Sequence, residues 1–263
     1  MLPEAKQHTL LYISTVLSGV YVFEYPSRRV VGILTDFFTP EGLCSDASGN
    51  VFVTDSYGRD VVEYAHGGSS PIRTLKGAAT PIDCAVDPKT GNLAVASETA
   101  AIYVFEPGRR WSNKRIDDPN ANFWFCTYDS QGNLFASDDS TYYNENFISE
   151  LPHGAHTFTN FALSKPIEYL GGIQAHDGYL TVGDGEDNNI YQVRISNSVA
   201  DIVRTTPLAG AKATDQFTFY RGKLISPDPS SDFAGVWKYP AGKLVRKFDG
   251  MTGEPFGSTI SAP

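Results

Sequence analysis

Long hydrophobic runs are missing from this sequence of 263 residues. The stretch that comes nearest to one, Thr9 to Phe23, is shorter than the roughly 20 residues that a membrane-spanning helix needs. Serine, threonine and glycine residues also interrupt it. Two β-strands explain this stretch better than a membrane span or a signal segment does. The sequence therefore predicts no membrane span.

Several motifs of common catalytic sites are missing as well. No serine lies in a Gly-x-Ser-x-Gly motif, and no glycine-rich loop resembles a phosphate cradle. The acidic loop at residues 183–189 lacks the spacing and the final glutamate of a calcium-binding EF-hand loop. These absences weigh against serine hydrolases, nucleotide-binding enzymes and EF-hand proteins.

Basic residues are fewer than acidic ones, with 21 Lys and Arg against 30 Asp and Glu, which gives a formal net charge of −9. This balance disfavours a nucleic acid as a partner. The low charge content of 19% and the many turns favour export, from a bacterial cell with the export signal removed, and a cytoplasmic location stays open. We expect a monomer.

A repeat accounts for most of the chain. Hydrophobic alternating runs begin at Asn50, Asn92, Asn133, Tyr179 and Lys223, at spacings of 42, 41, 46 and 44 residues, and an earlier run begins at Leu10. This spacing is typical of four-stranded propeller blades. A half-buried strand follows each run, then a short polar strand that suits the outer edge of a blade. Segments of small or flat residues precede the later runs and predict the innermost strands.

The two ends of the chain fit one closed ring. The first blade begins at its second strand, at Leu10, and lacks an innermost strand, whereas residues 254–261 at the C-terminus resemble the segment that begins at Pro40. Pairing of these two ends would close the ring and remove an open sheet edge. The sequence therefore predicts an all-β fold, a six-bladed β-propeller of four-stranded antiparallel blades, as a single domain over residues 1–263.

The three cysteines, Cys44, Cys84 and Cys126, all lie in predicted innermost strands. Cys84 and Cys126 occupy equivalent positions of their repeats, and Cys44 lies one place later than the equivalent Leu43. Equivalent residues point in the same rotational sense around a ring, and an odd count leaves one cysteine over. We therefore expect three buried thiols and no disulfide.

One face of the predicted ring collects most of the acidic residues. Loops between second and third strands, and loops that lead to each next innermost strand, emerge on this face. Aromatic residues occupy the same loops, and carboxylates beside rings suit a small molecule, a carbohydrate, or a cationic peptide or protein. The predicted ligand-binding residues are Phe38, Tyr57, Trp124, Tyr142, Tyr143, Tyr169 and Phe233.

The segment from Pro40 to Asp55 carries a family resemblance. It reads Pro-x-Gly and a strand, then Asp-x-x-Gly-Asn, then Val-x-Val-x-Asp. This unit resembles the repeat of NHL-type propellers and their six-bladed TolB-like and SMP-30-like relatives. The resemblance implies a fold rather than a function, because these relatives include lactonases, other enzymes and pure binding modules.

The lactonase branch, which includes the senescence-marker and gluconolactonase proteins, holds a divalent metal at the channel mouth. Glu41-Gly42 matches the opening Glu-Gly of that branch, whereas the equivalent positions of later repeats carry Ile82-Asp83, Trp124-Phe125 and Gly172-Ile173 in place of its other ligands.

A different ring of carboxylates is open to this chain. Glu41, Asp83, Asp215 and Glu254 all precede or begin predicted innermost strands and should converge near the axis. Oxygen ligands of this kind would favour Ca²⁺ or Mg²⁺, and without a cation the carboxylates would raise one another's pKa.

Two functions and a third, structural role follow from these patterns. The first is a non-catalytic propeller that binds a ligand or a protein through its acidic, aromatic-lined face. The second is a metal-dependent lactonase or hydrolase of the SMP-30-like kind, with the four carboxylates as metal ligands. The third is a scaffold whose function depends on neighbours absent from this chain.

Overall fold

The computed structural model describes residues 1–16, 18–138 and 146–263. Over these ranges the chain is almost wholly β-structure, with 24 strands and two short 3-10 helices, η1 (Pro3–Gln7) and η2 (Pro229–Ser231). A helix of sufficient length and hydrophobicity to span a membrane is absent from the described ranges.

The described strands form four sheets of four strands and one sheet of eight. The first sheet joins the two ends of the chain. Its strands, in spatial order, are β24 (Pro255–Ser261), β1 (Leu10–Thr15), β2 (Gly19–Glu24) and β3 (Val30–Leu34).

Three further four-stranded sheets follow the chain order. The second sheet contains β4 (Pro40–Ser45), β5 (Val51–Asp55), β6 (Asp60–Tyr64) and β7 (Pro71–Lys76). The third contains β8 (Pro81–Val86), β9 (Leu93–Ser97), β10 (Ala101–Phe105) and β11 (Lys114–Asp117). The last contains β20 (Thr218–Tyr220), β21 (Lys223–Asp228), β22 (Phe233–Lys238) and β23 (Lys243–Phe248).

The eight-stranded sheet contains two groups of four strands joined at their outer edges. One group is β12 (Phe123–Tyr128), β13 (Leu134–Asp138), β14 (Phe147–Leu151) and β15 (Thr159–Leu163). The other is β16 (Leu170–His176), β17 (Tyr179–Asp184), β18 (Asn189–Ser196) and β19 (Val199–Pro207). A parallel contact between β15 and β19 links them.

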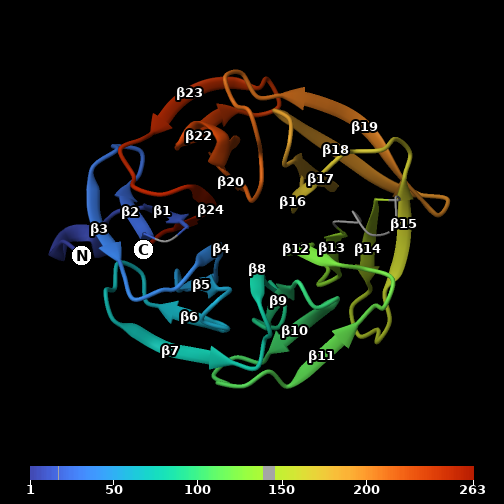
Figure 1. Ribbon diagram of the computed structural model, residues 1–263, viewed down its shortest axis with the longest axis horizontal. Coiled ribbons are helices and arrows are strands. Elements are labelled where there is room, and N and C mark those ends of the chain that lie inside the picture. The colour runs from blue at the N-terminus through green and yellow to red at the C-terminus, as the bar shows by residue number, and fades with distance from the viewer. Residues whose placement is uncertain (17, 139–145) are drawn as a thin grey trace.

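The sheets stand around a common centre like the blades of a wheel (Figure 1). The first strand of each group, β4, β8, β12, β16 and β20, lies near the centre together with β24, and the last strand of each group lies at the rim. Core side chains fill the spaces between neighbouring sheets. Phe52 and Val61 of the second sheet, for example, share one hydrophobic cluster with Val95 and Tyr103 of the third.

The turns between first and second strands follow from the Asp-x-x-Gly-Asn sequence. Asp46 Oδ1 accepts hydrogen bonds from the backbone N–H of Ser48 and of Asn50, and Asp46 Oδ2 accepts one from Asn50 Nδ2. Gly49 supplies a positive φ of +79° that other residues adopt at a cost. Asp129 makes the equivalent set of bonds in the turn after β12. The short motif thus fixes the start of the second strand.

The predicted pairing of the two chain ends is confirmed. Strand β24 runs antiparallel to β1, with Leu10 opposite Ser261 and Tyr12 opposite Thr259. On its other side β24 packs against β4. Ser45 Oγ of β4 donates a hydrogen bond to the carbonyl oxygen of Ile260. The C-terminal strand therefore bridges the first and second sheets.

The expectation of three free thiols was wrong. Cys44 and Cys84 form a disulfide, with their Cα atoms 5.7 Å apart, and among the described cysteines Cys126 alone is free. The cause is the one-place offset of Cys44. Side chains alternate between the two faces of a strand, so Leu43 packs into the cluster on one side of β4 and Cys44 into the cluster that contains Cys84.

Candidate binding site at the axial mouth

Side chains from the beginnings of the innermost strands gather at one end of the ring axis. Backbones approach closely there, as the glycines show. A Cβ atom at Gly42 would lie 2.5 Å from the carbonyl oxygen of Ile82 in the next sheet, and one at Gly257 would clash with the carbonyl oxygen of Glu41. We define the axial mouth as the side chains at this end, namely Glu41, Glu98, Trp124, Tyr169, Asp215 and Glu254.

Asp215 is the least satisfied carboxylate of the axial mouth. It lies just before β20 and is largely buried, and no hydrogen bond to its side chain occurs among the described residues. Its backbone oxygen is used, because it accepts a hydrogen bond from Gly172 N–H at 2.9 Å. Burial raises the pKa of Asp215 to about 7, and the charges of Glu254 and Asp228 add to the rise.

Glu41, the second residue of β4, has a similar environment. Burial raises the pKa of Glu41 to about 7, although a hydrogen bond from Ser56 Oγ at 2.7 Å works in the opposite direction. The charges of Glu98, Asp55 and Asp215 raise the pKa of Glu41 further. The charge of Asp215 therefore disfavours ionisation of Glu41.

Neither of these two carboxylates has a cationic neighbour. The ion pairs of the described residues all lie elsewhere, and none includes Glu41 or Asp215. Among the described residues, no lysine, arginine or histidine is a main cause of the pKa shift of either group. The axial mouth is thus a desolvated negative site without a counter-charge from the described chain.

Two aromatic rings border this site. Trp124 and Tyr169 meet edge to face, with their ring centroids 6.2 Å apart. A Cβ atom at Gly185 would clash with the Tyr169 ring and lie 3.0 Å from Asp215 Oδ1, so the ring and the carboxylate flank the same glycine. With the Asn122 amide oriented to satisfy its neighbours, its oxygen accepts a hydrogen bond from Trp124 Nε1 at 3.0 Å. The indole is thereby held in place.

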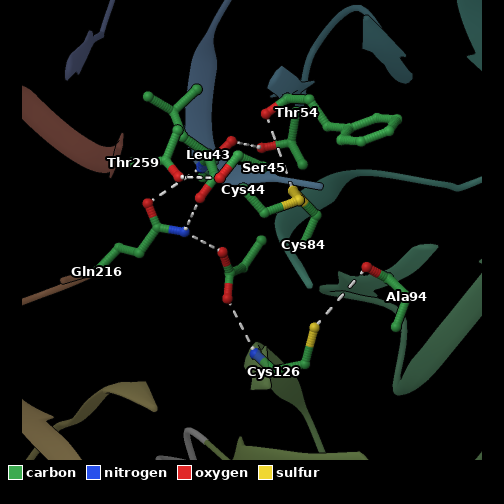
Figure 2. The surroundings of a disulfide bond; sticks show 12 residues. Leu43, Cys44, Ser45, Thr54, Cys84, Ala94, Cys126, Gln216 and Thr259 are labelled. Atoms are coloured by element: carbon green, nitrogen blue, oxygen red, sulfur yellow. Dashed lines mark hydrogen bonds between the residues drawn. A yellow bond between two sulfur atoms is a disulfide. The ribbon is translucent and has the colours of Figure 1, made fainter. Parts of the chain in front are cut away.

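Asp83 lies deeper on the axis and is fully occupied by protein groups. Its Oδ2 accepts a hydrogen bond from Cys126 N–H at 3.0 Å, and its Oδ1 accepts one from Gln216 Nε2. The Gln216 amide oxygen in turn accepts hydrogen bonds from Leu43 N–H and Ser258 N–H. Figure 2 shows Gln216 and Cys126 around the Cys44–Cys84 disulfide. This network ties four innermost strands together across the axis.

The predicted metal ligands Glu41, Asp83, Asp215 and Glu254 do not form one cation site. No group of three or more His, Cys, Asp or Glu side chains suited to a metal ion occurs in the described part of the chain. Asp83 points both of its oxygens at protein donors, and Glu254 is exposed outside the strand. Among the described residues, Asp215 acts on Glu41 through its charge and not through a hydrogen bond. The residues present therefore do not fit a bound Ca²⁺ or Mg²⁺.

The predicted aromatic residues divide into four sets. Trp124 and Tyr169 border the axial mouth, as described above. Phe38 and Tyr57 lie in loops and are 74% and 81% exposed. Phe233 belongs to the core, where it is 4% exposed and packs near Trp237, so its expected place on the open face was wrong. Tyr142 and Tyr143 lie outside the described residues.

Gln216, Ser56 and Glu98 were not predicted as site residues from the sequence. Gln216 directly follows Asp215 at the start of a predicted innermost segment, so its position was available as a signal. Its role was not, because the hydrogen bonds that define it come from residues at sequence separations of 42 to 173.

Comparison with known proteins identifies the fold. No family model and no curated protein matches the sequence. The chain is similar to a structure titled "Crystal structure of Nidogen/Laminin Complex", with a TM-score of 0.79 and 15% identity over 97% of this chain and 98% of that one. It is also similar to hydrazine synthase of Kuenenia stuttgartiensis, with a TM-score of 0.69 and 14% identity over 90% and 75% of the two chains.

The chain is a β-propeller. Identities this low show the fold alone, and the ligands of these propellers say nothing direct about the ligand of this one. The resemblance to NHL-type and SMP-30-like propellers rests on the repeat sequence, since no family model matches.

Proposed function

We propose that this propeller is a binding protein whose axial mouth receives a cationic side chain, lysine or arginine, from a peptide or protein partner. The observation that carries the proposal is Asp215. Its largely buried carboxylate has neither a hydrogen-bond donor nor a counter-charge among the described residues, and its charge raises the pKa of Glu41, which also lacks a cation.

An ammonium or guanidinium group would complete this arrangement chemically. It supplies the positive charge and the N–H donors that both carboxylates lack. The faces of Trp124 and Tyr169 add favourable cation–π contacts, of about 0.5–2 kcal/mol each. A neutral sugar would leave the two carboxylates repelling each other, which is why the cationic ligand is favoured.

The lactonase interpretation requires a metal held by several side chains. The described residues contain no group suited to that purpose, and Asp83 is committed to the network around Gln216. The binding interpretation needs no metal, because it requires only that Glu41 and Asp215 lack a counter-charge among the described residues.

Isothermal titration calorimetry with blocked tripeptides tests the proposal. The probes are acetyl-Gly-Lys-Gly-amide and acetyl-Gly-Arg-Gly-amide, with acetyl-lysine and citrulline versions as uncharged analogues. At pH 8 we expect the charged probes to bind at least about tenfold more tightly than the neutral ones, a difference of about 1.4 kcal/mol. Asp215→Asn and Glu41→Gln should remove this preference.

Glu186→Gln is the matched control, because Glu186 is an exposed acid of the loop that contains Gly185. It changes the net charge equally and should leave the preference intact. Equal binding of charged and neutral probes, or an unchanged preference in Asp215→Asn, would contradict the proposal. Hydrolysis of a lactone that requires a divalent ion and is lost in Glu41→Gln would favour the enzyme interpretation instead.

We infer that the ring has six blades and forms one domain. In the described residues, strand pairing between the two halves of the eight-stranded sheet covers two positions, Ala162 with Val199 and Leu163 with Ala200. Each half has four antiparallel strands in chain order, like the other four sheets. Counting the halves as separate blades gives six blades of four strands, and thermal unfolding in one cooperative step would support the single domain.

We also propose an extracytoplasmic location. The Cys44–Cys84 disulfide supports it, because disulfides persist in oxidising compartments and are rare in the cytosol. Free thiols can be alkylated as intact cells are lysed in denaturant. We expect one alkylated cysteine per chain, and three would contradict the location.

A further inference from the structure

A cavity lies between the two halves of the eight-stranded sheet, away from the axial mouth. Its volume is about 560 Å³. One wall comes from the β12–β13 turn and from β13 and β14, and the other from β16, β17, β18 and the turn between β16 and β17. We refer to it as the inter-blade cleft. Volumes of about 300–1,000 Å³ are typical of small-molecule sites.

The inter-blade cleft opens at the opposite end of the strands from the axial mouth. Glu41 and Tyr169 stand at the beginnings of innermost strands or just before them, whereas the turn residues of the cleft, Ser130 and Asp177, follow the ends of such strands. A ligand in the cleft would therefore not compete for Glu41 or Asp215.

The floor of the cleft is apolar. Phe135, Leu180 and Val193 line it and belong to one buried hydrophobic cluster. They are 7%, 6% and 0% exposed. An apolar group of a ligand would rest on this floor and displace water from it.

Two opposite charges line the cleft without pairing. Glu150 of β14 and Arg194 of β18 both border it, and no ion pair of the described residues includes either of them. Neither Asp129 nor Asp177 competes for Arg194, since Asp129 accepts the hydrogen bonds of its own turn and Asp177 pairs with His176. Glu150 and Arg194 are thus available to a ligand.

The guanidinium of Arg194 is held in position on its own side of the cleft. Its Nη2 donates a hydrogen bond to Tyr179 Oη at 2.7 Å, and its Cζ lies 5.1 Å from the centre of the Tyr179 ring. The remaining N–H groups of the guanidinium stay free to bind a carboxylate in a bidentate fashion. Such preorganisation lowers the entropy lost when a ligand binds.

We propose that the inter-blade cleft binds an amphipathic zwitterion of amino-acid or dipeptide size. Its ammonium group contacts Glu150, its carboxylate contacts Arg194, and its apolar side chain packs on the exposed parts of Phe135 and Leu180. Only a ligand with both charges pairs both walls of the cleft, so either charge alone leaves one wall unpaired.

Calorimetric titration of the full chain tests this site, with L-leucine and L-leucyl-L-leucine as probes. The N-acetyl form of each probe removes the positive charge, and the amide form removes the negative charge. In the wild-type protein we expect the zwitterion to bind at least about tenfold more tightly than either blocked form. Tighter binding of the dipeptide or of the amino acid identifies which of the two fits.

Single substitutions assign each charge to its wall. Glu150→Gln should abolish the discrimination against the N-acetyl probe and keep the discrimination against the amide, and Arg194→Gln should do the reverse. Glu186→Gln and Arg110→Gln, exposed and outside the cleft, make the same changes of net charge and should bind as the wild type does. Thermal melting confirms that each variant is folded.

Absence of saturation at about 10 mM probe would overturn the proposal, since that limit corresponds to a binding free energy weaker than about 3 kcal/mol. Equal binding of zwitterionic and blocked probes would overturn it as well, because the cleft would then bind only the apolar part. Discrimination that survives both substitutions places the binding elsewhere.

Discussion

The carboxylate of Asp215 destabilises the fold at neutral and basic pH. Its pKa of about 7 in the folded chain lies above the value of about 3.9 expected in the unfolded chain. The folded state therefore binds the proton more tightly than the unfolded state does. The corresponding stability is fully present below about pH 4 and is lost as the pH rises to 7. A binding site that buries an unpaired charge therefore lowers the free energy of unfolding.

Asp215→Asn should accordingly stabilise the protein at pH 8. The substitution removes a desolvated charge and breaks no side-chain hydrogen bond of the described residues. We expect the free energy of unfolding to rise by about 1–3 kcal/mol at pH 8, because one pKa unit corresponds to about 1.4 kcal/mol, and to change little at pH 4. Urea unfolding at the two pH values measures this difference.

Glu186→Gln, at an exposed site, should change stability by less than about 0.5 kcal/mol at either pH. Loss of stability in Asp215→Asn at pH 8 would show that the Asp215 carboxylate has a partner that stabilises its charge.

At the scale of elements, the Cys44–Cys84 disulfide joins β4 and β8, the innermost strands of two neighbouring sheets, across a sequence separation of 40 residues. Closing a loop of that length restricts the unfolded chain. Reduction, or replacement of both cysteines by alanine, should lower the free energy of unfolding by about 2–4 kcal/mol. Urea unfolding with and without a reducing agent measures the effect.

The double alanine variant should be indifferent to the reducing agent, and Cys126→Ala should respond to it as the wild type does. A wild-type protein whose unfolding ignores the reducing agent would contradict the disulfide.

Strand β24 holds the ring closed, so its removal should strongly destabilise the fold. A chain that ends at Gly253 loses the partner of β1 and exposes a sheet edge beside β4. We expect no cooperative thermal unfolding for this truncation. A chain that ends at Ser261 keeps all of β24 and should melt within a few degrees of the full chain. Similar melting of both truncations would show that β24 contributes little.

Most elements could be predicted from the sequence, because turn and strand signals act locally. The Asp-x-x-Gly-Asn turns around Gly49 and Gly132 and the return of the C-terminal strand to Leu10 follow from the repeat. The contact between β15 and β19 did not, since it arises from the unusual length of β18 and β19, with eight and nine residues. The disulfide was not predicted, because its formation depends on the opposite faces of β4 to which Leu43 and Cys44 point.

At the scale of the whole molecule, the sequence predicted where acids meet but not what each one does. Glu41 and Asp215 were expected near the axis, and the charge of Asp215 raises the pKa of Glu41. Asp83 shares their position in the repeat, yet it serves the network of Gln216 and Cys126. This difference depends on side chains from distant blades, so no local pattern contains it. The inter-blade cleft has the same origin, because it forms between two halves of one sheet.

We propose above that Glu41 and Asp215 form a negative site without a counter-charge, which a cationic side chain of a partner neutralises. Carbon-13 NMR titration of the side-chain carboxyl groups, with and without saturating acetyl-Gly-Lys-Gly-amide, measures the pKa values on which this proposal depends. The account predicts midpoints near 7 for both carboxylates in the free protein. With the peptide, the midpoints should fall toward the ordinary values of about 4. Midpoints that are already near 4 without the peptide, or that stay near 7 with it, would contradict the account.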